Sequence, residues 1–216
     1  MMTLTTFRYV PPFAAGHVRD LRVRWALEEA GQGYELRLVG FDDTKQPAYR
    51  QEQPFGQVPV LQDGALTLFE TGAILLHLGE RYPVLLPADA ARRAQATMWI
   101  FAALNSVEPH VANLSNLLAF SKDEPWAEGA RPGMEAMALR RLAEVDAWLD
   151  GGDYLAGEFG VADILMSTVL RLLDDTDFVQ RFGRLHAYHE RCMARPAFRK
   201  ALADQMALYA SAPAPA

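Results

Sequence analysis

The chain has 216 residues, half of them hydrophobic, which suffices for two small domains or one larger domain with a sizeable core. It carries 21 basic and 27 acidic residues, and the net charge of −6 argues against nucleic acid as a general partner. No apolar run approaches the roughly 20 residues of a membrane span, and no signal-peptide pattern opens the chain, so we expect a soluble cytoplasmic protein without a membrane partner.

The first third of the chain alternates strand and helix patterns. Apolar residues at helical spacing indicate the helices, and alternation with polar residues indicates the strands. We expect a strand at residues 3–8, a loop at 9–16, a helix at 17–30, a strand from Tyr34, a helix near 47–52, a hairpin, and a helix ending near Arg81. This order is thioredoxin-like, with the first two strands parallel and the hairpin antiparallel.

Residues 54–71 read PFGQVPVLQDGALTLFET and are the most informative segment. They predict a strand from Val58, a turn whose Gly64 can take positive φ, and a return strand. Pro59 has no N–H and fits only at the mouth of a strand, where a cis X–Pro bond costs about 0.5–1 kcal/mol. A cis Val58–Pro59 bond would turn the backbone of Val58 outward, where an extended peptide can pair with it.

The hairpin is followed by a helix start at Glu70 and Thr71. Free N–H groups at a helix start favour a carboxylate. A peptide-like ligand with a free α-carboxylate therefore matches both Val58–Pro59 and this helix start.

The rest of the chain reads as helical. Pro83 and Pro87 punctuate the pattern, so we place a linker at residues 84–88 between domains at 1–83 and 89–209. The expected helices are residues 89–120, 131–150, 161–175, 182–194 and 197–209. We expect the tail at 210–216 to be disordered.

Three segments together resemble the glutathione S-transferase family, of the bacterial, cytosolic type. Residues 55–71 resemble its Val–cisPro and Glu–Ser/Thr glutathione-binding elements, and RVRWALEEAG at 22–31 resembles its first helix. GVADILMSTVL at 160–170 resembles its C-terminal folding motif, with Gly160 where the family usually has Ser or Thr. The segments fall in the family's order and spacing, and the likeness covers nearly the whole chain. It implies a thioredoxin-like N-terminal domain plus an all-α C-terminal domain, glutathione as co-substrate, a homodimer, and no metal site.

The resemblance also implies contacts to each part of glutathione. Lys45 and Gln57 would meet the glycyl carboxylate, although a solvated lysine in a polar loop explains Lys45 equally well. Val58, beside the cis proline, would pair with the cysteinyl backbone. Glu70 would accept from the γ-glutamyl ammonium, and Thr71 would hold the γ-glutamyl carboxylate.

The group that activates the thiol is left open. A thiol titrates near 8.5 and only the thiolate attacks efficiently, and the resemblance implies a Tyr or Ser hydroxyl just after the first strand. The loop YVPPFAAGHVRDL is longer than usual and has no Ser, so Tyr9 is the first candidate. Alternatives are His17 and backbone N–H groups near residues 13–16, and Tyr9 would then only pack at the domain edge. The single cysteine, Cys192, lies in a late helix, which argues against a protein mixed disulfide.

A small, apolar electrophile would bind between the domains. Trp99, Ala102, Ser106 and Asn105 keep approximate helical spacing and would share a cleft-facing side, with Trp99 and Asn105 as the candidate contacts. We therefore expect a glutathione transferase. The alternatives are another glutathione-dependent enzyme, such as an isomerase, dehalogenase or ether-cleaving enzyme, and a non-catalytic interaction module with the same fold.

Overall fold

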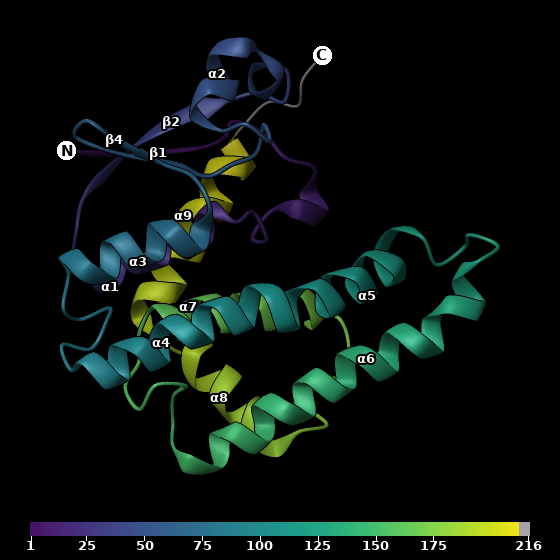
Figure 1. The fold of residues 1–216 in the computed structure, drawn as a ribbon. Coiled ribbons are helices and arrows are strands. Elements are labelled where there is room, and N and C mark those ends of the chain that lie inside the picture. The colour runs from purple at the N-terminus through teal and green to yellow at the C-terminus, as the bar shows by residue number, and fades with distance from the viewer. Residues whose placement is uncertain (212–216) are drawn as a thin grey trace. The chain divides into compact units, whose positions relative to one another are not determined.

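The computed structural model describes residues 1–211, which fall into two compact units (Figure 1). Unit 1 contains Met1–Leu85 and residues 195–211, and unit 2 contains Leu86–Ala194. The boundary between Leu85 and Leu86 lies within the linker expected at residues 84–88. No helix in the described part of the chain is long and apolar enough to cross a membrane.

Unit 1 is built on a mixed sheet of four strands. The strands are β1 (Met2–Phe7), β2 (Tyr34–Val39), β3 (Val60–Asp63) and β4 (Leu66–Leu68), in the order β2-β1-β3-β4. β1 and β2 are parallel, whereas β1 pairs antiparallel with β3, and β3 with β4. The predicted thioredoxin-like topology is therefore confirmed. β3 begins two residues later than predicted, because Val58 precedes the ladder.

Helices cover both faces of this sheet. Figure 1 shows α2 (Pro47–Glu52) on the face opposite α1 (Asp20–Glu29) and α3 (Thr71–Arg81). α2 starts with proline, whose fixed φ suits the first turn of a helix. α1 starts three residues later than predicted, so His17 lies in the preceding loop. That loop contains a 3₁₀ turn at Pro12–Ala14, and a second 3₁₀ turn lies at Asp43–Lys45.

The C-terminal helix α9 (Pro196–Ser211) belongs to unit 1, although the sequence analysis grouped residues 197–209 with the second domain. A buried polar network explains this placement. The Asp20 carboxylate accepts hydrogen bonds from Arg24 Nε at 2.5 Å and from Gln205 Nε2 at 2.7 Å. The hydroxyls of Thr6 and Tyr209 lie 3.1 Å apart. Burial raises the pKa of Asp20, against the opposing effect of Arg24.

Ion pairs at the other end of α1 strengthen the same contact. Arg195 donates to both oxygens of Glu29, at 2.6 and 2.8 Å, and Lys200 donates to Glu28 at 2.8 Å. These partners lie more than 160 residues apart in the chain. α9 also includes residues 210 and 211, which were expected in the tail, and residues 212–216 lie outside the described residues.

Unit 2 is helical throughout its core. Its helices are α4 (Ala90–Ala102), α5 (Glu108–Phe120), α6 (Ala127–Trp148), α7 (Val161–Leu170) and α8 (Gly183–Met193). A π-helical segment at Ala103–Val107 joins α4 to α5, and 3₁₀ turns follow α6 and α7 at Leu149–Gly151 and Arg171–Leu173. Figure 1 shows α5 and α6 running side by side, in agreement with their packing contacts.

α7 forms the centre of unit 2. All of its residues are buried, and the hydroxyls of Ser167 and Thr168 donate to carbonyls of the helix itself. Its start is capped by the Asp163 carboxylate, which accepts from the N–H groups of Gly160 at 2.9 Å and Leu155 at 3.0 Å. Burial raises the pKa of Asp163 to about 6, although these hydrogen bonds favour the ionised form. The carboxylate at this position compensates for Gly160, which has no capping side chain.

Candidate functional site

The peptide before Val58–Pro59 is clamped from two sides. The Val58–Pro59 bond is cis, as predicted. The hydroxyl of Tyr49 donates to the Gln57 carbonyl at 2.7 Å, and Gln53 Oε1 accepts from the Gln57 N–H at 3.2 Å. Tyr49 and Gln53 are buried, whereas the Gln57 side chain is exposed. The clamp therefore fixes the Gln57 backbone and leaves its side chain available to a ligand.

The buried side chain of Val58 also holds this segment in place. It is buried in a cluster with Val39, Tyr49 and Val60 on one face of the sheet. β3 enters its ladder with β1 only at Val60, so the Val58 backbone precedes the paired residues. The buried side chain fixes Val58 in place, and its backbone N–H and C=O are not paired in the β1–β3 ladder. An added peptide strand requires both features at this position.

Gly56 makes the tight approach to this segment possible. It has a φ of +65°, and a Cβ built there would lie 2.7 Å from the Arg50 guanidinium and 2.8 Å from the Thr44 carbonyl oxygen. Only glycine accepts both the conformation and the crowding. The sequence analysis gave Gly56 no role, although a glycine two residues before a Val-Pro pair was a usable signal.

The start of α3 shows backbone strain at an exposed residue. Glu70 is the N-cap, with φ +69° and ψ +118°, and among the described residues no other non-glycine has positive φ. Such a conformation costs on the order of 1–3 kcal/mol and tends to occur at functional sites. The Glu70 side chain is exposed, whereas Thr71, the first residue of the helix, is buried.

Thr71 has a buried cationic partner that the sequence analysis did not identify. Arg22 Nη1 donates to Thr71 Oγ1 at 3.2 Å, from α1 to α3. Arg22 is only 4% exposed. Arg22 lies in the RVRWALEEAG segment, but no sequence signal separated it from Arg24, whose guanidinium instead meets Asp20.

Strand register brings these elements to one end of the sheet. Leu61 pairs with Leu68, so the entrance to β3 at Val58–Pro59 and the exit from β4 toward Glu70 lie at the same end of the hairpin. Thr5 pairs with Val60, so the end of β1 lies there too. The loop containing Tyr9 therefore starts beside these segments.

The remaining candidate residues of unit 1 are Tyr9, His17 and Lys45, and the first two lie in the loop between β1 and α1. Tyr9 is half-buried, two residues beyond the end of β1, and His17 is exposed, with its N–H donating to the Ala14 carbonyl at 3.0 Å. Lys45 is exposed and forms a 2.8 Å ion pair with Asp42. The hydrogen bond and charge of Lys45 lower the pKa of Asp42. Lys45 thus has a solvated partner of its own.

The two predicted electrophile contacts differ in their exposure. Trp99 is only 9% exposed, and its ring packs on Trp148 with 5.2 Å between centroids. Asn105 is exposed and lies in the π-helical segment, where the wider turn alters the α-helical spacing. Trp99 is thus largely buried within unit 2, and a common cleft-facing side for Trp99 and Asn105 stays a prediction.

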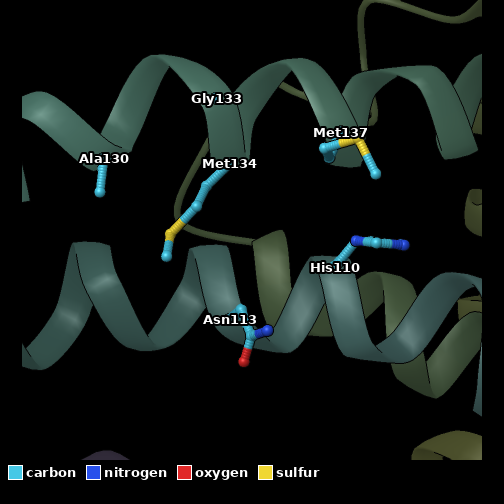
Figure 2. A pocket seen from close by; sticks show the side chains of 6 residues that line it. All are labelled: His110, Asn113, Ala130, Gly133, Met134 and Met137. Carbon is cyan, nitrogen blue, oxygen red and sulfur yellow. The ribbon is translucent and has the colours of Figure 1, made fainter.

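Unit 2 has a groove of its own between α5 and α6, with a volume of about 390 Å³. Figure 2 shows Met134 and Met137 extending from α6 toward α5, with His110 beside Met137. The lining residues are His110, Asn113, Ala130, Gly133, Met134 and Met137. Neither Trp99 nor Asn105 lines this groove. The signal for it was the 130–133–134–137 spacing of small and methionine residues along one helix face.

Comparison with known proteins agrees with this architecture. The model of the N-terminal domain of glutathione S-transferases matches residues 4–80, and that of the C-terminal domain matches residues 106–196. The chain belongs to the glutathione S-transferase family. Glutathione S-transferase 4 of Zea mays is 32% identical to it over 207 residues, covering 89% of this chain and 90% of the relative.

Other members of the family show the same similarity. Glutathione S-transferase F10 of Arabidopsis thaliana is 31% identical over 173 residues, covering 72% of this chain and 75% of the relative. Glutathione transferase F2 of Populus trichocarpa shares the fold with a TM-score of 0.83 at 23% identity, covering 96% of this chain and 100% of that one. A glutathione transferase of Burkholderia graminis, solved with two glutathione molecules per subunit, shares the fold with a TM-score of 0.81 at 26% identity. The match covers 93% of this chain and 87% of that one. The predicted family and two-part fold are confirmed.

Proposed function

We propose that this protein conjugates the thiolate of glutathione to small, apolar electrophiles. Family membership makes it a glutathione transferase with glutathione as co-substrate. The observation that carries the finer proposal is the meeting of Val58–Pro59, Glu70 and Thr71 at one end of the hairpin. An extended peptide with a free α-carboxylate and ammonium has a partner for each group there.

Each part of glutathione is assigned a partner in unit 1. The Val58 backbone pairs with the cysteinyl residue as an added strand would. The N-terminus of α3 and the Thr71 hydroxyl hold the γ-glutamyl carboxylate, and the exposed Glu70 carboxylate accepts from the γ-glutamyl ammonium. Gln57 and Lys45 reach the glycyl carboxylate, and Lys45 exchanges its surface partner Asp42 for it.

The Tyr9 hydroxyl is the first choice for stabilising the thiolate. A hydrogen bond to S⁻ favours the charged form of the thiol. Lowering the thiol pKa by about two units requires about 2.7 kcal/mol of differential stabilisation. His17 and the backbone N–H groups of residues 13–16 are the alternative donors. The thiolate sulfur then forms a bond to the electrophilic carbon. An aryl halide loses its halide ion, the enolate formed from an enone takes up a proton at its α-carbon, and the alkoxide formed from an opened epoxide takes up a proton at oxygen.

An apolar electrophile is supported by an exposed aromatic side chain in this loop. The ring of Phe13, four residues beyond Tyr9, is 64% exposed. Asn105, which is exposed, and Trp99, which is 9% exposed, stay the proposed electrophile contacts. The homodimer and the cytoplasmic location also stay predictions, and sedimentation equilibrium of the purified chain tests the first.

The function is tested by mass spectrometry of glutathione incubated with a panel of electrophiles. Aryl halides, enones and epoxides should give stable thioether adducts. Turnover confined to isomerisation, reductive dehalogenation or aryl-ether cleavage would instead favour another glutathione-dependent enzyme. Thr71→Ala should weaken glutathione binding by about 1–3 kcal/mol in calorimetry, the cost of losing a hydrogen bond to a charged group. Glutathione bound without any adduct across the panel would instead indicate an interaction module.

A further inference from the structure

We propose that Arg22 is a positioning residue that directs the Thr71 hydroxyl toward the ligand and so makes the site selective for a carboxylate. This inference rests on the proposed function, because it concerns the same γ-glutamyl end of glutathione. It assigns Arg22 a role in ligand choice without contact to the reacting sulfur.

The geometry of the pair is the first argument. Arg22 Nη1 lies 3.2 Å from Thr71 Oγ1, and both residues are at least nine-tenths buried. α1 and α3 pack against each other, so the guanidinium reaches the helix start from within unit 1. Bulk water therefore has little access to compete for this hydrogen bond.

The chemistry of the two groups is the second argument. A guanidinium has only donors, whereas a hydroxyl has one hydrogen and two acceptor lone pairs. Thr71 Oγ1 must therefore accept from Arg22, and its own hydrogen must point elsewhere. Thr71 is the first residue of α3, so the carbonyls three and four residues before it belong to no helical turn. Within residues 1–211, no acceptor is found for the hydroxyl hydrogen of Thr71. An oxygen atom of a bound ligand can be that acceptor.

The charge of Arg22 is the third argument. It lies beside the N-terminus of a helix of 11 residues, whose partial positive charge also favours anions. An oriented hydroxyl donor, a helix start and a buried cation together favour a charged acceptor over a neutral one. Because the hydroxyl is the link between Arg22 and the ligand, the effect of Arg22 should depend on Thr71.

The test compares glutathione with its analogue in which the γ-glutamyl α-carboxylate is a carboxamide. Calorimetry on the full chain should show the parent preferring glutathione by about tenfold or more, since hydrogen bonds to charged groups are the stronger ones. Arg22→Gln should weaken glutathione binding about tenfold and change carboxamide binding less than about twofold. In a Thr71→Val background, Arg22→Gln should weaken glutathione binding by less than about threefold. The effects of substitutions at two residues in contact are not additive, and the hydroxyl through which Arg22 acts is already absent.

Controls separate this role from folding and from net charge. Arg19→Gln removes an exposed positive charge just before α1 and should leave the carboxylate preference intact. Arg22→Lys keeps a cation that can only donate, so it should retain most of the preference for glutathione over the carboxamide. This variant provides the test if thermal denaturation shows that Arg22→Gln does not fold stably. Equal weakening of both ligands by Arg22→Gln, or the same cost with and without the Thr71 hydroxyl, would overturn the proposal. A parent that binds neither ligand would instead refute the proposed function.

Discussion

The hydroxyl of Tyr49 donates a 2.7 Å hydrogen bond to the carbonyl oxygen of Gln57, across the turn that separates α2 from β3. Burial raises the pKa of Tyr49 to about 12, so the hydroxyl keeps its proton throughout the neutral range. Together with Gln53, it holds the peptide that precedes Val58 in one orientation. The proposed peptide-binding edge thus depends on a buried tyrosine that does not itself meet the ligand.

Tyr49→Phe keeps the ring and removes only this hydrogen bond. The unsatisfied Gln57 carbonyl should cost about 1–3 kcal/mol of unfolding free energy. The KM for glutathione should rise several-fold, because the Val58 backbone is less well positioned, while kcat for an electrophile changes little. Steady-state kinetics checks this. Tyr82→Phe is the matched control, since Tyr82 donates to Gln32 at 3.3 Å, and it should leave KM unaltered.

Tyr9→Phe tests the assignment of the thiol-activating group. If the hydroxyl stabilises the thiolate, the pKa of bound glutathione should rise by about one unit or more, or about 1.4 kcal/mol per unit. Affinity for glutathione should barely change, because the contacts to its two ends remain. Thiolate absorbance against pH gives the answer. Coincident curves for mutant and parent would transfer the role to His17 or to the backbone of residues 13–16.

Gly56→Ala and Gly64→Ala form a matched pair. Both glycines have positive φ, +65° and +62°, so alanine at either costs about 1–2 kcal/mol in backbone conformation. A Cβ at Gly64 meets nothing within 4 Å, whereas a Cβ at Gly56 meets the Arg50 guanidinium and the Thr44 carbonyl. Gly56→Ala should therefore lower the unfolding free energy further and also weaken glutathione binding. Equal denaturation midpoints for the two variants would contradict this.

The buried Asp163 predicts a specific pH dependence of stability. Burial raises its pKa to about 6 in the folded chain, above the value in the unfolded chain. Its contribution to stability is therefore complete below about pH 4 and is lost as pH rises through about 6. Relative to Asp163→Asn, the unfolding free energy of the parent should fall by on the order of 3 kcal/mol between pH 4 and 7.

An exposed carboxylate supplies the control of opposite sign. A hydrogen bond from Arg181 lowers the pKa of Asp177, so its contribution is present above the unfolded pKa and is lost on acidification. Urea titrations of Asp163→Asn, Asp177→Asn and the parent at several pH values provide the comparison. A pH-independent difference between the parent and Asp163→Asn would count against an ionising buried cap.

The sequence by itself determined the features that depend on neighbouring residues. The cis proline before β3, the positive φ of Gly64 in the hairpin turn and the start of α3 near Thr71 were predicted as the structure has them. α2 matched its predicted range of residues 47–52. These features follow from a missing N–H, from a glycine that tolerates positive φ, and from apolar spacing, all of which are local properties of the chain.

Only the tertiary structure decided which side chains meet. Arg22 and Arg24 are two residues apart on α1, yet one reaches Thr71 and the other Asp20. The π-helical segment at Ala103–Val107 changed the helical spacing between Trp99 and Asn105. α9 joined unit 1 through Gln205, 185 residues from Asp20. Burial of a polar group is favourable only when its partner lies within hydrogen-bond reach, and that partner is set by the packing of distant segments.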